Sequence, residues 1–402
     1  MSLDRLYSPK QQEVLRYYAN HDFFMLINHG AKRSGKTVLD NDLFLQELRR
    51  VRKIADAQHV ASPQYILAGA DLSSVQRNVL TELSNKYHLD FKMDKANRFT
   101  LFGVKVCCFG HSKINDLGRI RGMTAYGAYI NEATVANQEV FNEIKSRCSA
   151  DGARLIMDTN PDRPGHWLKK DYIDRADQRT IAEFHWALSD NTFLTKRYVE
   201  SIKASTPSGM FTDRDIFGAW VAAAGIIYPD FDRNIHYIRS SDVPDIDYYF
   251  TGVDFGWEHP GAFCLFGNGV DGKLYLLRIW CAKYRSINDW IKIANEINST
   301  CGDILYYCDS ARPDLLDEMT SSGIRAVGAR KDVVAGIGEV ATLLKTRQLL
   351  IVRDCGEGFG EFDEEIEMYA WKDSADAPVK EKDDVMDAMR YGIFSDKFYG
   401  NR

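Results

Sequence analysis

The sequence lacks long apolar runs. None of its 402 residues lies in an uninterrupted stretch near the ~18 apolar residues that a membrane span needs, and the N-terminus lacks the basic-then-apolar order of a signal peptide. The hydrophobic share of 45% and the charged share of 27% are typical of soluble globular proteins. We therefore expect no membrane partner.

Paired cysteines and an excess of basic residues are missing as well. The eight cysteines lie mostly in apolar, strand-like runs without metal-ligand spacing, which predicts buried thiols in a reducing compartment. The net charge of −6 leaves no surplus of Lys and Arg for general neutralisation of nucleic-acid phosphates. Any contact with DNA is therefore expected to be local.

The most informative segment that is present is a glycine-rich run with the spacing of a phosphate-binding loop. It consists of Gly30, Ala31, Lys32, Arg33, Ser34, Gly35, Lys36 and Thr37. An apolar run precedes it and a helical pattern begins near Val38, so backbone N–H groups and a helix N-terminus would surround phosphate oxygens. Lys36 would reach the β- and γ-phosphates of ATP, and Thr37 would hold Mg²⁺. The alternative is an ordinary glycine-containing turn with a surface lysine.

A helix is expected to begin upstream of this loop. Ser8 fits an N-cap, proline follows it, and Gln11 stands three residues after the cap. Capping explains these residues by itself, while a second interpretation gives Gln11 or Gln12 a contact with adenine. Downstream, strands are expected at 65–68 and 99–108, and the second of these segments is expected to form a hairpin around Gly103. Their alternation with helical patterns predicts an α/β domain with a mainly parallel sheet.

A short strand ends at Asn131 and Glu132. An acidic residue at a strand end is where a phosphate-loop enzyme orients the attacking water, so Glu132 is the candidate general base. An aspartate commonly precedes this base and binds the Mg²⁺ shell through water, but Asn131 brings no charge. The alternative for Glu132 is a carboxylate that stabilises a helix N-terminus by ~0.3–1 kcal/mol. A further strand ends in Thr159 and Asn160, which could sense the γ-phosphate.

The second half of the chain has a looser start. Apolar periodicity weakens between about 206 and 243, so we predict a first domain at 1–210, a linker region at 211–243 and a second domain at 244–402. The second domain is expected to contain three antiparallel strands within 248–280, a helix at 288–298, a strand at 304–309 and a final helix from Asp383.

Carboxylates end two of these strands and begin the final helix. They are Asp254, Asp309, Asp384 and Asp387, of which the last two share one helix face. Hard oxygen ligands suit a pair of Mg²⁺ or Mn²⁺ ions that hydrolyse a phosphodiester, which predicts a ribonuclease-H-like α/β nuclease domain with a mixed sheet. The alternative is that the first two residues merely start turns and that the other two favour the helix dipole.

Further motifs follow one another along the chain: Arg121-Gly122, Asn131-Glu132-Ala133, Thr159-Asn160-Pro161 with His166-Trp167, Gly218-Ala219-Trp220 and Gly225 to Phe231. Together with the phosphate loop, this order resembles the large subunit of tailed-bacteriophage terminases, the ATP-driven DNA-packaging motors. The resemblance covers nearly the whole chain.

The resemblance assigns roles to several residues. It implies that Lys36 and Thr37 bind ATP and Mg²⁺ and that Glu132 activates water. It also implies that the Thr159-Asn160 pair couples hydrolysis to domain movement and that Arg121 acts on the ATP of a neighbouring subunit. Terminase nuclease domains carry aspartates at positions that match the predicted metal site.

Three positions depart from the family's usual pattern. The family usually has arginine at the third loop position, where this chain has Lys32 followed by Arg33. It usually has aspartate where Asn131 stands, and often histidine where Asp384 stands. The first two departures concern the nucleotide site, and the third makes the predicted metal site more acidic.

The resemblance implies a motor subunit that hydrolyses ATP to move double-stranded DNA into a procapsid and cuts concatemeric DNA with a two-metal endonuclease. The implied partners are DNA, the small terminase subunit and the portal protein, with a homo-oligomeric ring during packaging in the cytoplasm of the infected bacterial host. One alternative is a cellular DNA helicase or repair ATPase with a nuclease domain. Another is a non-catalytic assembly protein in which both sites have decayed.

Overall fold

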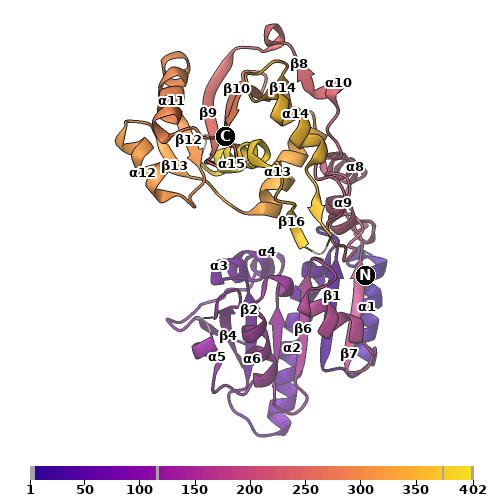
Figure 1. Cartoon of the computed structure of the whole chain (residues 1–402). Helices are drawn as coiled ribbons and strands as arrows, with labels where there is room; N and C mark the ends of the chain where they lie inside the picture. The colour runs from indigo at the N-terminus through magenta and orange to yellow at the C-terminus, as the bar shows by residue number, and fades with distance from the viewer. Residues whose placement is uncertain (1–4, 115–116, 374, 400–402) are drawn as a thin grey trace. The chain divides into compact units, whose positions relative to one another are not determined.

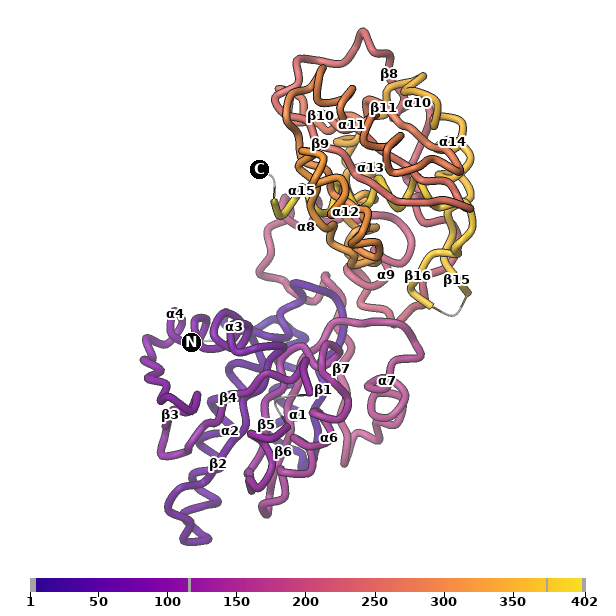
Figure 2. The backbone as a smooth tube through the Cα atoms, turned by 60° about the vertical axis from the view of Figure 1, so that its left-hand side comes forward, coloured from indigo at the N-terminus to yellow at the C-terminus, as the bar shows by residue number. Residues whose placement is uncertain are grey.

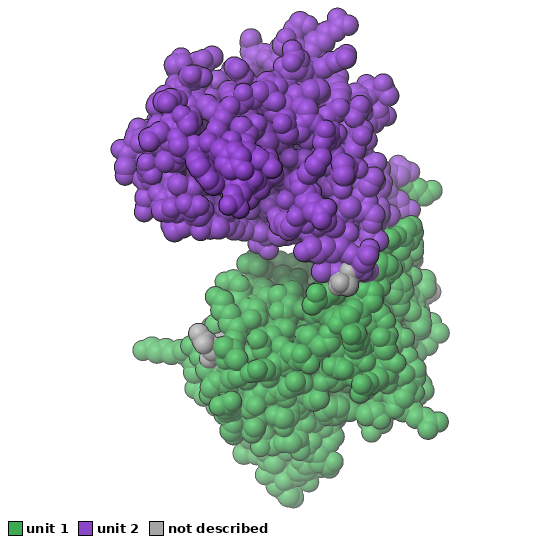
Figure 3. Space-filling model, viewed as in Figure 1, with its two compact units in different colours: residues 1–199, 213–221 green, residues 200–212, 222–402 purple. Residues whose placement is uncertain are grey.

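Two compact units, coloured separately in Figure 3, make up the structure. Each unit is built around one seven-stranded sheet, drawn as a cartoon in Figure 1 and as a tube in Figure 2. The computed structural model describes residues 5–114, 117–373 and 375–399. The first unit comprises Met1–Val199 and Asp213–Val221, and the second comprises Glu200–Thr212 and Ala222–Arg402.

Two of the three boundaries between the units, at 212/213 and 221/222, lie in the predicted linker region, and the third, at 199/200, lies before it. Residues 213–221 belong to the first unit and residues 222–243 to the second. Within the latter range, strand β8 (Tyr237–Ile238) is part of the second sheet. Whether 1–210 and 244–402 fold independently, as the predicted division implies, stays a prediction.

The sheet of the first unit is parallel apart from one edge strand. Its strands are β1 Met25–Gly30, β2 Gln64–Gly69, β3 Arg98–Leu101, β4 Val104–Gly110, β5 Gly127–Ile130, β6 Arg154–Thr159 and β7 Ile181–Trp186. They lie in the order β3-β4-β2-β5-β6-β1-β7, and β3 forms the predicted antiparallel hairpin with β4. Because β6 lies between β5 and β1, the carboxyl ends of these three parallel strands meet at one edge. The predicted α/β fold with a mainly parallel sheet is confirmed.

Helices cover both faces of this sheet. The first begins as predicted, because Ser8 and Gln11 form a capping box at its N-terminus. The helices are α1 Pro9–Asn20, α2 Lys36–Ala57, α3 Leu72–Val75, α4 Thr81–Tyr87, α5 Leu117–Ile120, α6 Gln138–Arg147 and α7 Trp167–Asp171, with short turns η2 Gln76–Leu80, η4 Ala133–Val135, η5 Ile173–Arg175 and η6 Leu188–Asp190.

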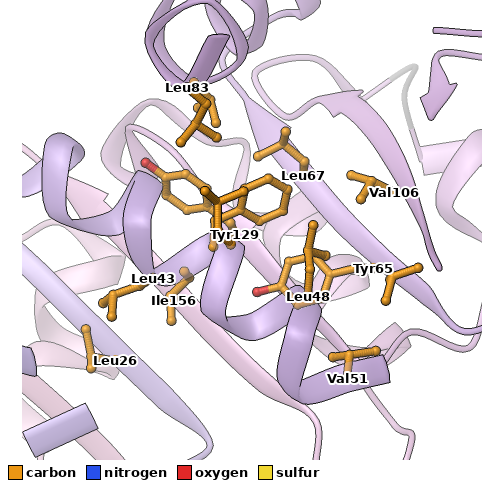
Figure 4. Close-up of a cluster of buried hydrophobic side chains, with 14 of the residues drawn as sticks. Leu26, Leu43, Leu48, Val51, Tyr65, Leu67, Leu83, Val106, Tyr129 and Ile156 are labelled. Carbon is orange, nitrogen blue, oxygen red and sulfur yellow. The ribbon is translucent and has the colours of Figure 1, made fainter. Parts of the chain in front are cut away.

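Alternate residues of the strands enter two hydrophobic cores, one on each face of the sheet. Leu26 of β1, Tyr129 of β5 and Ile156 of β6 share one core with Leu43 and Leu48 of α2 (Figure 4). Their neighbours along the strands enter the other core, which α6 covers. Because side chains alternate along a strand, the residues two positions further on also lie on the α2 face. Those residues stand at the strand ends, beside the phosphate loop.

The sheet of the second unit is mixed. Besides β8, its strands are β9 Ile246–Asp254, β10 Gly261–Gly269, β11 Leu274–Ala282, β12 Leu305–Cys308, β13 Ala326–Gly328 and β14 Leu349–Val352. Their order is β13-β12-β9-β10-β11-β14-β8. The three central strands are antiparallel, as predicted, and the flanking pairs are parallel. The predicted α/β domain with a mixed sheet is confirmed.

Helices pack on both faces of this sheet too. One face shares a core with α11 and α12, in which the rings of Phe263 and Trp290 stack. The other face carries the final helix, α15, which contacts β9, β10 and β12. The helices with residues in this unit are α8 Lys196–Ser205, α9 Met210–Asp215, α10 Arg233–His236, α11 Ile287–Cys301, α12 Pro313–Ser321, α13 Val333–Lys345, α14 Phe359–Met368 and α15 Asp384–Tyr399, with η7 Ser240–Asp242 and a two-stranded sheet of β15 Trp371–Lys372 and β16 Ala375–Pro378.

A glycine contact sets how closely α15 approaches the sheet. Gly252 of β9 faces Ala388 and Gly392 of α15, and a Cβ atom on Gly252 would lie 2.0 Å from the Ala388 carbonyl oxygen. Asp254, two residues further along β9, lies on the same face of the sheet. The missing side chain at Gly252 therefore brings the carboxylate-bearing start of α15 close to Asp254.

The substitution Gly252→Ala tests this contact. We expect it to push α15 away from the sheet and to lower the melting temperature of the second unit, because overpacking commonly costs about 1–3 kcal/mol. The control is Gly360→Ala in α14, where an added Cβ meets nothing within 4 Å. Equal melting temperatures of the two variants in a calorimetric scan would contradict the close approach of α15.

Two expectations about the whole chain can be compared with the structure. All eight cysteines are free thiols, and seven of them are buried, as predicted. Among the described residues, no helix is long and apolar enough to cross a membrane.

Candidate functional site

The phosphate loop connects β1 to α2. Gly30 ends β1 at φ +139°, and a Cβ there would lie 2.0 Å from the Trp186 carbonyl oxygen, so only glycine fits. Gly35 caps α2 with φ +98°, a left-handed conformation that glycine also favours. The two glycines thus turn the chain from the strand into the N-terminus of the helix, which is the connection that phosphate-binding loops use.

Lys36 is buried inside this loop. Its ammonium donates hydrogen bonds to the carbonyl oxygens of Gly30 (2.9 Å) and Ala31 (2.5 Å) and to Ser34 Oγ (3.2 Å). Burial lowers the pKa of Lys36 to about 8, although nearby carboxylates oppose the shift. A buried cation held by neutral oxygens gains most from a negatively charged ligand, so the loop fits the phosphates of a nucleotide.

Asp158 lies at the centre of the three strand ends. It stands two residues after Ile156, so its side chain lies on the α2 face of the sheet. One carboxylate oxygen accepts the hydroxyl of Thr37, and the other accepts the backbone N–H of Glu132 at 3.0 Å. The Asn131 amide nitrogen donates to both oxygens, at 2.9 and 3.2 Å. The predicted Mg²⁺ residue, the predicted base and Asn131 are therefore gathered by a residue that the sequence analysis did not single out.

Glu132 follows Asn131, the first residue after β5, and has a left-handed conformation with φ +58°. Burial, and then the charge of Asp158, raises the pKa of its carboxyl group. A carboxylate with a raised pKa accepts a proton more readily near neutral pH, which suits a general base. The position of Glu132 beside the phosphate loop agrees with the predicted role, which stays a prediction.

Thr159 and Asn160 connect the loop to the segment after Glu132. The Asn160 side-chain oxygen lies 3.4 Å from the Lys36 ammonium. Thr159 Oγ1 lies 2.6 Å from Thr134 Oγ1 and accepts the Thr134 backbone N–H at 2.8 Å. The strand end that follows Asp158 thus touches the phosphate-loop lysine on one side and the turn after the candidate base on the other.

Gln11 is engaged by the protein itself. Its side-chain oxygen accepts the Ser8 N–H at 2.9 Å, and its amide nitrogen donates to the Gly35 carbonyl oxygen at 3.0 Å. These contacts support the capping interpretation and also attach α1 to the phosphate loop. A contact of Gln11 or Gln12 with adenine stays a prediction.

The remaining predicted cations of the first unit lie at the surface. Lys32 is exposed and forms an ion pair with Asp215 at 3.0 Å. Arg33 is exposed, with φ +59°, and its carbonyl oxygen accepts the Asn191 amide at 2.7 Å. Arg121 is exposed just after α5, where a guanidinium can reach a neighbouring molecule. Its predicted action in trans stays a prediction.

The predicted carboxylates of the second unit line one cleft with a volume of about 990 Å³. Asp254 ends β9, Asp309 follows the adjacent parallel strand β12, and Asp384 and Asp387 lie in the first turn of α15. The structure thus brings together carboxylates from three segments that stand far apart in the sequence. Lys380 and Lys382 line the same cleft.

The other three carboxylates all affect the pKa of Asp254. Burial, and then the charges of Asp387, Asp309 and Asp384, raises its pKa well above the ordinary range. A carboxylate whose ionisation is opposed by burial and by other carboxylates gains from a bound cation. Carboxylate oxygens are the hard ligands that Mg²⁺ and Mn²⁺ prefer, and the donor set therefore fits these ions.

Two of the four carboxylates are paired with cations of the protein. Asp387 accepts Lys380 at 2.7 Å on one oxygen and Arg390 at 2.8 Å on the other, while Lys331 contacts Asp309. Burial opposes ionisation of Asp387, but Arg390 and Lys380 outweigh it and lower its pKa. A metal ion at Asp387 therefore has to compete with these cations, which the sequence analysis did not anticipate.

His259 is a further residue that the sequence analysis missed. Its Nδ1 lies 2.8 Å from an Asp384 oxygen, and ligand atoms of Asp254, His259 and Asp384 lie within 4.8 Å of one another. The imidazole comes from the turn between β9 and β10, at the cleft wall. Its distance of only five residues from Asp254 is the one sequence signal that pointed to it.

Glu365 of α14 holds the first turn of α15. It accepts the backbone N–H groups of Val385 (2.9 Å) and Met386 (3.0 Å). Burial raises its pKa to about 8, although these two hydrogen bonds oppose the shift. Helix N-termini need such acceptors, and here the acceptor positions the helix that carries Asp384 and Asp387.

This raised pKa predicts a pH-dependent stability. The neutral form of Glu365 is favoured in the folded state, so its contribution is complete below its ordinary pKa of 4.5 and is lost as pH rises to about 8. Glu365→Gln keeps an acceptor oxygen without the charge, so its melting temperature should fall less than that of the wild type between pH 6 and pH 9. Glu361→Gln, an exposed change in the same helix, is the control and should follow the wild type. If the melting temperatures of all three proteins fell by the same amount between pH 6 and pH 9, the raised pKa of Glu365 would be contradicted.

Comparisons with known proteins agree with this geometry. A family model described as "Terminase large subunit, T4likevirus-type, N-terminal" matches residues 31–235, about half of the chain. The chain belongs to the large terminase subunits. No curated protein sequence matches it.

Solved large terminases are similar over the whole chain. The structure of the large terminase from a thermophilic bacteriophage has a TM-score of 0.80 at 25% identity, with 98% of this chain and 99% of that chain covered. The terminase of the same phage in complex with ADP gives a TM-score of 0.78 at 25% identity, covering 98% and 100%. Its complex with ATP-γ-S gives 0.75 at 26%, covering 97% and 98%. The resemblance in the sequence motifs is thereby confirmed.

Proposed function

We propose that this terminase subunit is an ATP-driven DNA-packaging motor protein that also cuts DNA. The observation that carries the proposal is the presence of two separate sites for phosphorus chemistry in one chain. The first unit joins a phosphate loop to Glu132 through Asp158, and the second gathers four aspartates in one cleft. The similarity to the thermophilic-phage terminase structures with ADP and ATP-γ-S supports ATP as the ligand of the first site.

The first site binds and orients ATP with its own residues. Backbone N–H groups of the loop and the N-terminus of α2 face the phosphates, and Lys36 exchanges its carbonyl partners for β- and γ-phosphate oxygens. Mg²⁺, when bound at Thr37, neutralises charge on these oxygens. Glu132 holds the attacking water and accepts its proton.

Loss of the γ-phosphate is sensed through β6. Asn160 contacts Lys36, and Thr159 contacts the turn that follows Glu132. A shift of Lys36 on hydrolysis therefore changes a contact of the strand end that also holds Asp158. This chain of contacts supports the predicted coupling role of Thr159 and Asn160.

The second site cuts the DNA backbone. Asp254, Asp309, Asp384 and Asp387 would hold Mg²⁺ or Mn²⁺, which activates water and stabilises the leaving oxygen. Lys380 lines the cleft and forms an ion pair with Asp387, and it would be available to bind a DNA phosphate if Asp387 held a metal ion instead. The substrate is double-stranded DNA in concatemeric form.

The proposed setting is the packaging complex. The small terminase subunit and the portal protein are the proposed partners, and a homo-oligomeric ring of this chain is the proposed motor, in the cytoplasm of the infected bacterial host. An exposed Arg121 supports the ring, because an arginine that completes a neighbour's site must be accessible.

Two assays on the full chain test the proposal together. ATP turnover with Mg²⁺ and nicking of supercoiled plasmid with Mn²⁺ should both be detected. Unwinding of a forked duplex without cleavage would favour a helicase instead. If the folded protein shows neither activity, the non-catalytic assembly role would be favoured.

Action of Arg121 in trans has its own test. Arg121→Ala should lower ATP turnover under conditions where subunits assemble, because the arginine finger is supplied to the next subunit. Mixing it with a Lys36→Ala chain should restore part of the activity, since each variant lacks a different half of a shared site. A defect of equal size in dilute monomer and in assembled protein would place Arg121 within its own subunit's site.

A further inference from the structure

The position before the candidate base carries no charge in this chain, yet a carboxylate stands next to it. Asn131 is held on three sides: its side-chain oxygen accepts the Asn78 amide at 2.9 Å, and its carbonyl oxygen lies 2.7 Å from His111 Nε2. Its amide nitrogen points at Asp158. Asn131 is therefore fixed as a donor to that carboxylate.

The neighbouring strand, β6, places the carboxylate of Asp158 beside Asn131. β6 lies between β5 and β1, and Asp158 is paired in register with Asn28 of β1. Asp158 is only 2% exposed, and Thr37, Asn131 and Glu132 all donate to it. Neutral donors add no positive charge beside the carboxylate, so they do not oppose its attraction for a nearby cation.

A second buried carboxylate near the loop, Asp40, does not have this geometry. One of its oxygens accepts the Asn28 amide at 2.6 Å, and Asn28 in turn accepts the Trp186 indole N–H at 2.9 Å. The hydroxyl of Thr37 donates its hydrogen bond to Asp158 instead. The two carboxylates therefore differ in their partners: Asp158 accepts the hydroxyl of the predicted Mg²⁺ residue, whereas Asp40 accepts the Asn28 amide of β1.

We propose that Asp158 provides the negative charge for the water shell of Mg²⁺ that an aspartate before the general base usually provides. Asn131 is then a neutral spacer that positions Asp158. This inference rests on the proposed ATPase function and deepens it. Compared with the usual arrangement, the negative charge stands at the end of β6 and not at the end of β5, while the positions of Thr37 and Glu132 are the usual ones.

According to the proposal, the single negative charge can stand at position 131 or at position 158, but charges at both positions would not improve Mg²⁺ binding. In Asn131→Asp, two carboxylates would lie about 3 Å apart in a buried site, where like charges strongly disfavour each other. In the double variant Asn131→Asp/Asp158→Asn, one charge remains and its amide partner remains too, with the two groups exchanged. The double variant should therefore behave more like the wild type than either single variant.

The experiment measures how Mg²⁺ changes the affinity of the full chain for a fluorescent ADP analogue, with and without EDTA. Asp158→Asn should bind the analogue in EDTA as the wild type does, but the gain on adding Mg²⁺ should fall by about 10–100-fold, the usual cost of losing an outer partner of a metal site. The double variant should recover most of this gain. Asp40→Asn removes the other buried carboxylate and should leave the gain unchanged.

Each outcome decides the proposal. An unchanged Mg²⁺ gain in Asp158→Asn, or a loss of equal size in Asp40→Asn, overturns it. If Asp158→Asn does not fold, the double variant decides: a folded protein with the wild-type gain supports the proposal, and one without it overturns the proposal. A wild type that binds no nucleotide refutes the proposed ATPase function and the inference with it, whereas failure of the variants alone refutes only the inference.

Discussion

Glu132→Gln is expected to bind ATP normally and to lose its turnover by a factor of about 10²–10⁴, the usual contribution of a positioned general base. The substitution is nearly isosteric and leaves the backbone N–H of residue 132 on Asp158. It removes only the carboxylate that is proposed to accept the proton. Burial, and then the charge of Asp158, raises the pKa of that carboxyl group. Nucleotide affinity should stay unchanged because Lys36 and the loop backbone, not Glu132, are the proposed contacts of the phosphates.

The control for this prediction is Glu139→Gln, the same change at an exposed position in the first turn of α6. It should keep full turnover. Single-turnover hydrolysis with protein in excess separates the chemical step from product release. Wild-type turnover by Glu132→Gln would remove the base assignment, and the acceptor of the proton would then have to be another carboxylate of the strand ends, with Asp158 the first to examine.

The phosphate loop was predictable because its information is local. Two glycines, a lysine and a threonine at fixed spacing, between a strand and a helix, specify the turn and the cradle without reference to other strands. The same holds for the capping box at Ser8 and Gln11 and for the hairpin around Gly103. Such features depend on residues a few positions apart.

Asp158 was not predictable in this way. It stands in an apolar strand, and its importance arises from the order β5-β6-β1, which makes β6 the neighbour of both the loop and the base. The only sequence signal is a single carboxylate in the apolar run that precedes Thr159. The strand order is set by packing across the whole sheet, so a pattern along one segment does not contain it.

The carboxylate cleft of the second unit also combines features that the sequence predicts with contacts that only the fold creates. The four aspartates were found because each ends a strand or begins a helix. The pairing of Asp387 with Lys380 and Arg390, and the approach of His259 to Asp384, depend on how the cleft closes. These contacts change the expectation for the metal ion, which must displace or share protein cations at Asp387, whereas at Asp254 the neighbouring charges are mainly those of other carboxylates.

The largest expected effect in the second unit is that of Asp254→Asn. It should abolish metal-dependent DNA cleavage, by more than about a hundredfold, because loss of a direct ligand exceeds the 10–100-fold cost of losing an outer partner. ATP turnover should remain within about twofold of the wild type, since the nucleotide loop belongs to the other unit. Plasmid nicking and ATP hydrolysis measured on one preparation check both expectations.

The same variant should make the metal-free chain more stable. The pKa of Asp254 is raised well above its ordinary value of 3.8, so the stabilising contribution of its neutral form is lost as pH rises through the raised pKa. Asparagine resembles the neutral acid at every pH, and the melting temperature of Asp254→Asn should exceed that of the wild type by more at pH 9 than at pH 4. Added Mn²⁺ should raise the melting temperature of the wild type and not that of the variant, because only the wild type binds the ion in its folded state.

Asp317→Asn, an exposed change in α12, is the matched control and should show neither the added stability nor the loss of cleavage. The combination of higher metal-free stability with lost cleavage is specific to a buried metal ligand, because a carboxylate with a purely structural role would destabilise the fold on replacement. Cleavage by purified Asp254→Asn at the wild-type rate would show that the cleft does not bind its metal through β9. If Asp254→Asn melts at a lower temperature than the wild type at pH 9, the protein itself stabilises the ionised form of Asp254, and no bound metal ion is needed to do so.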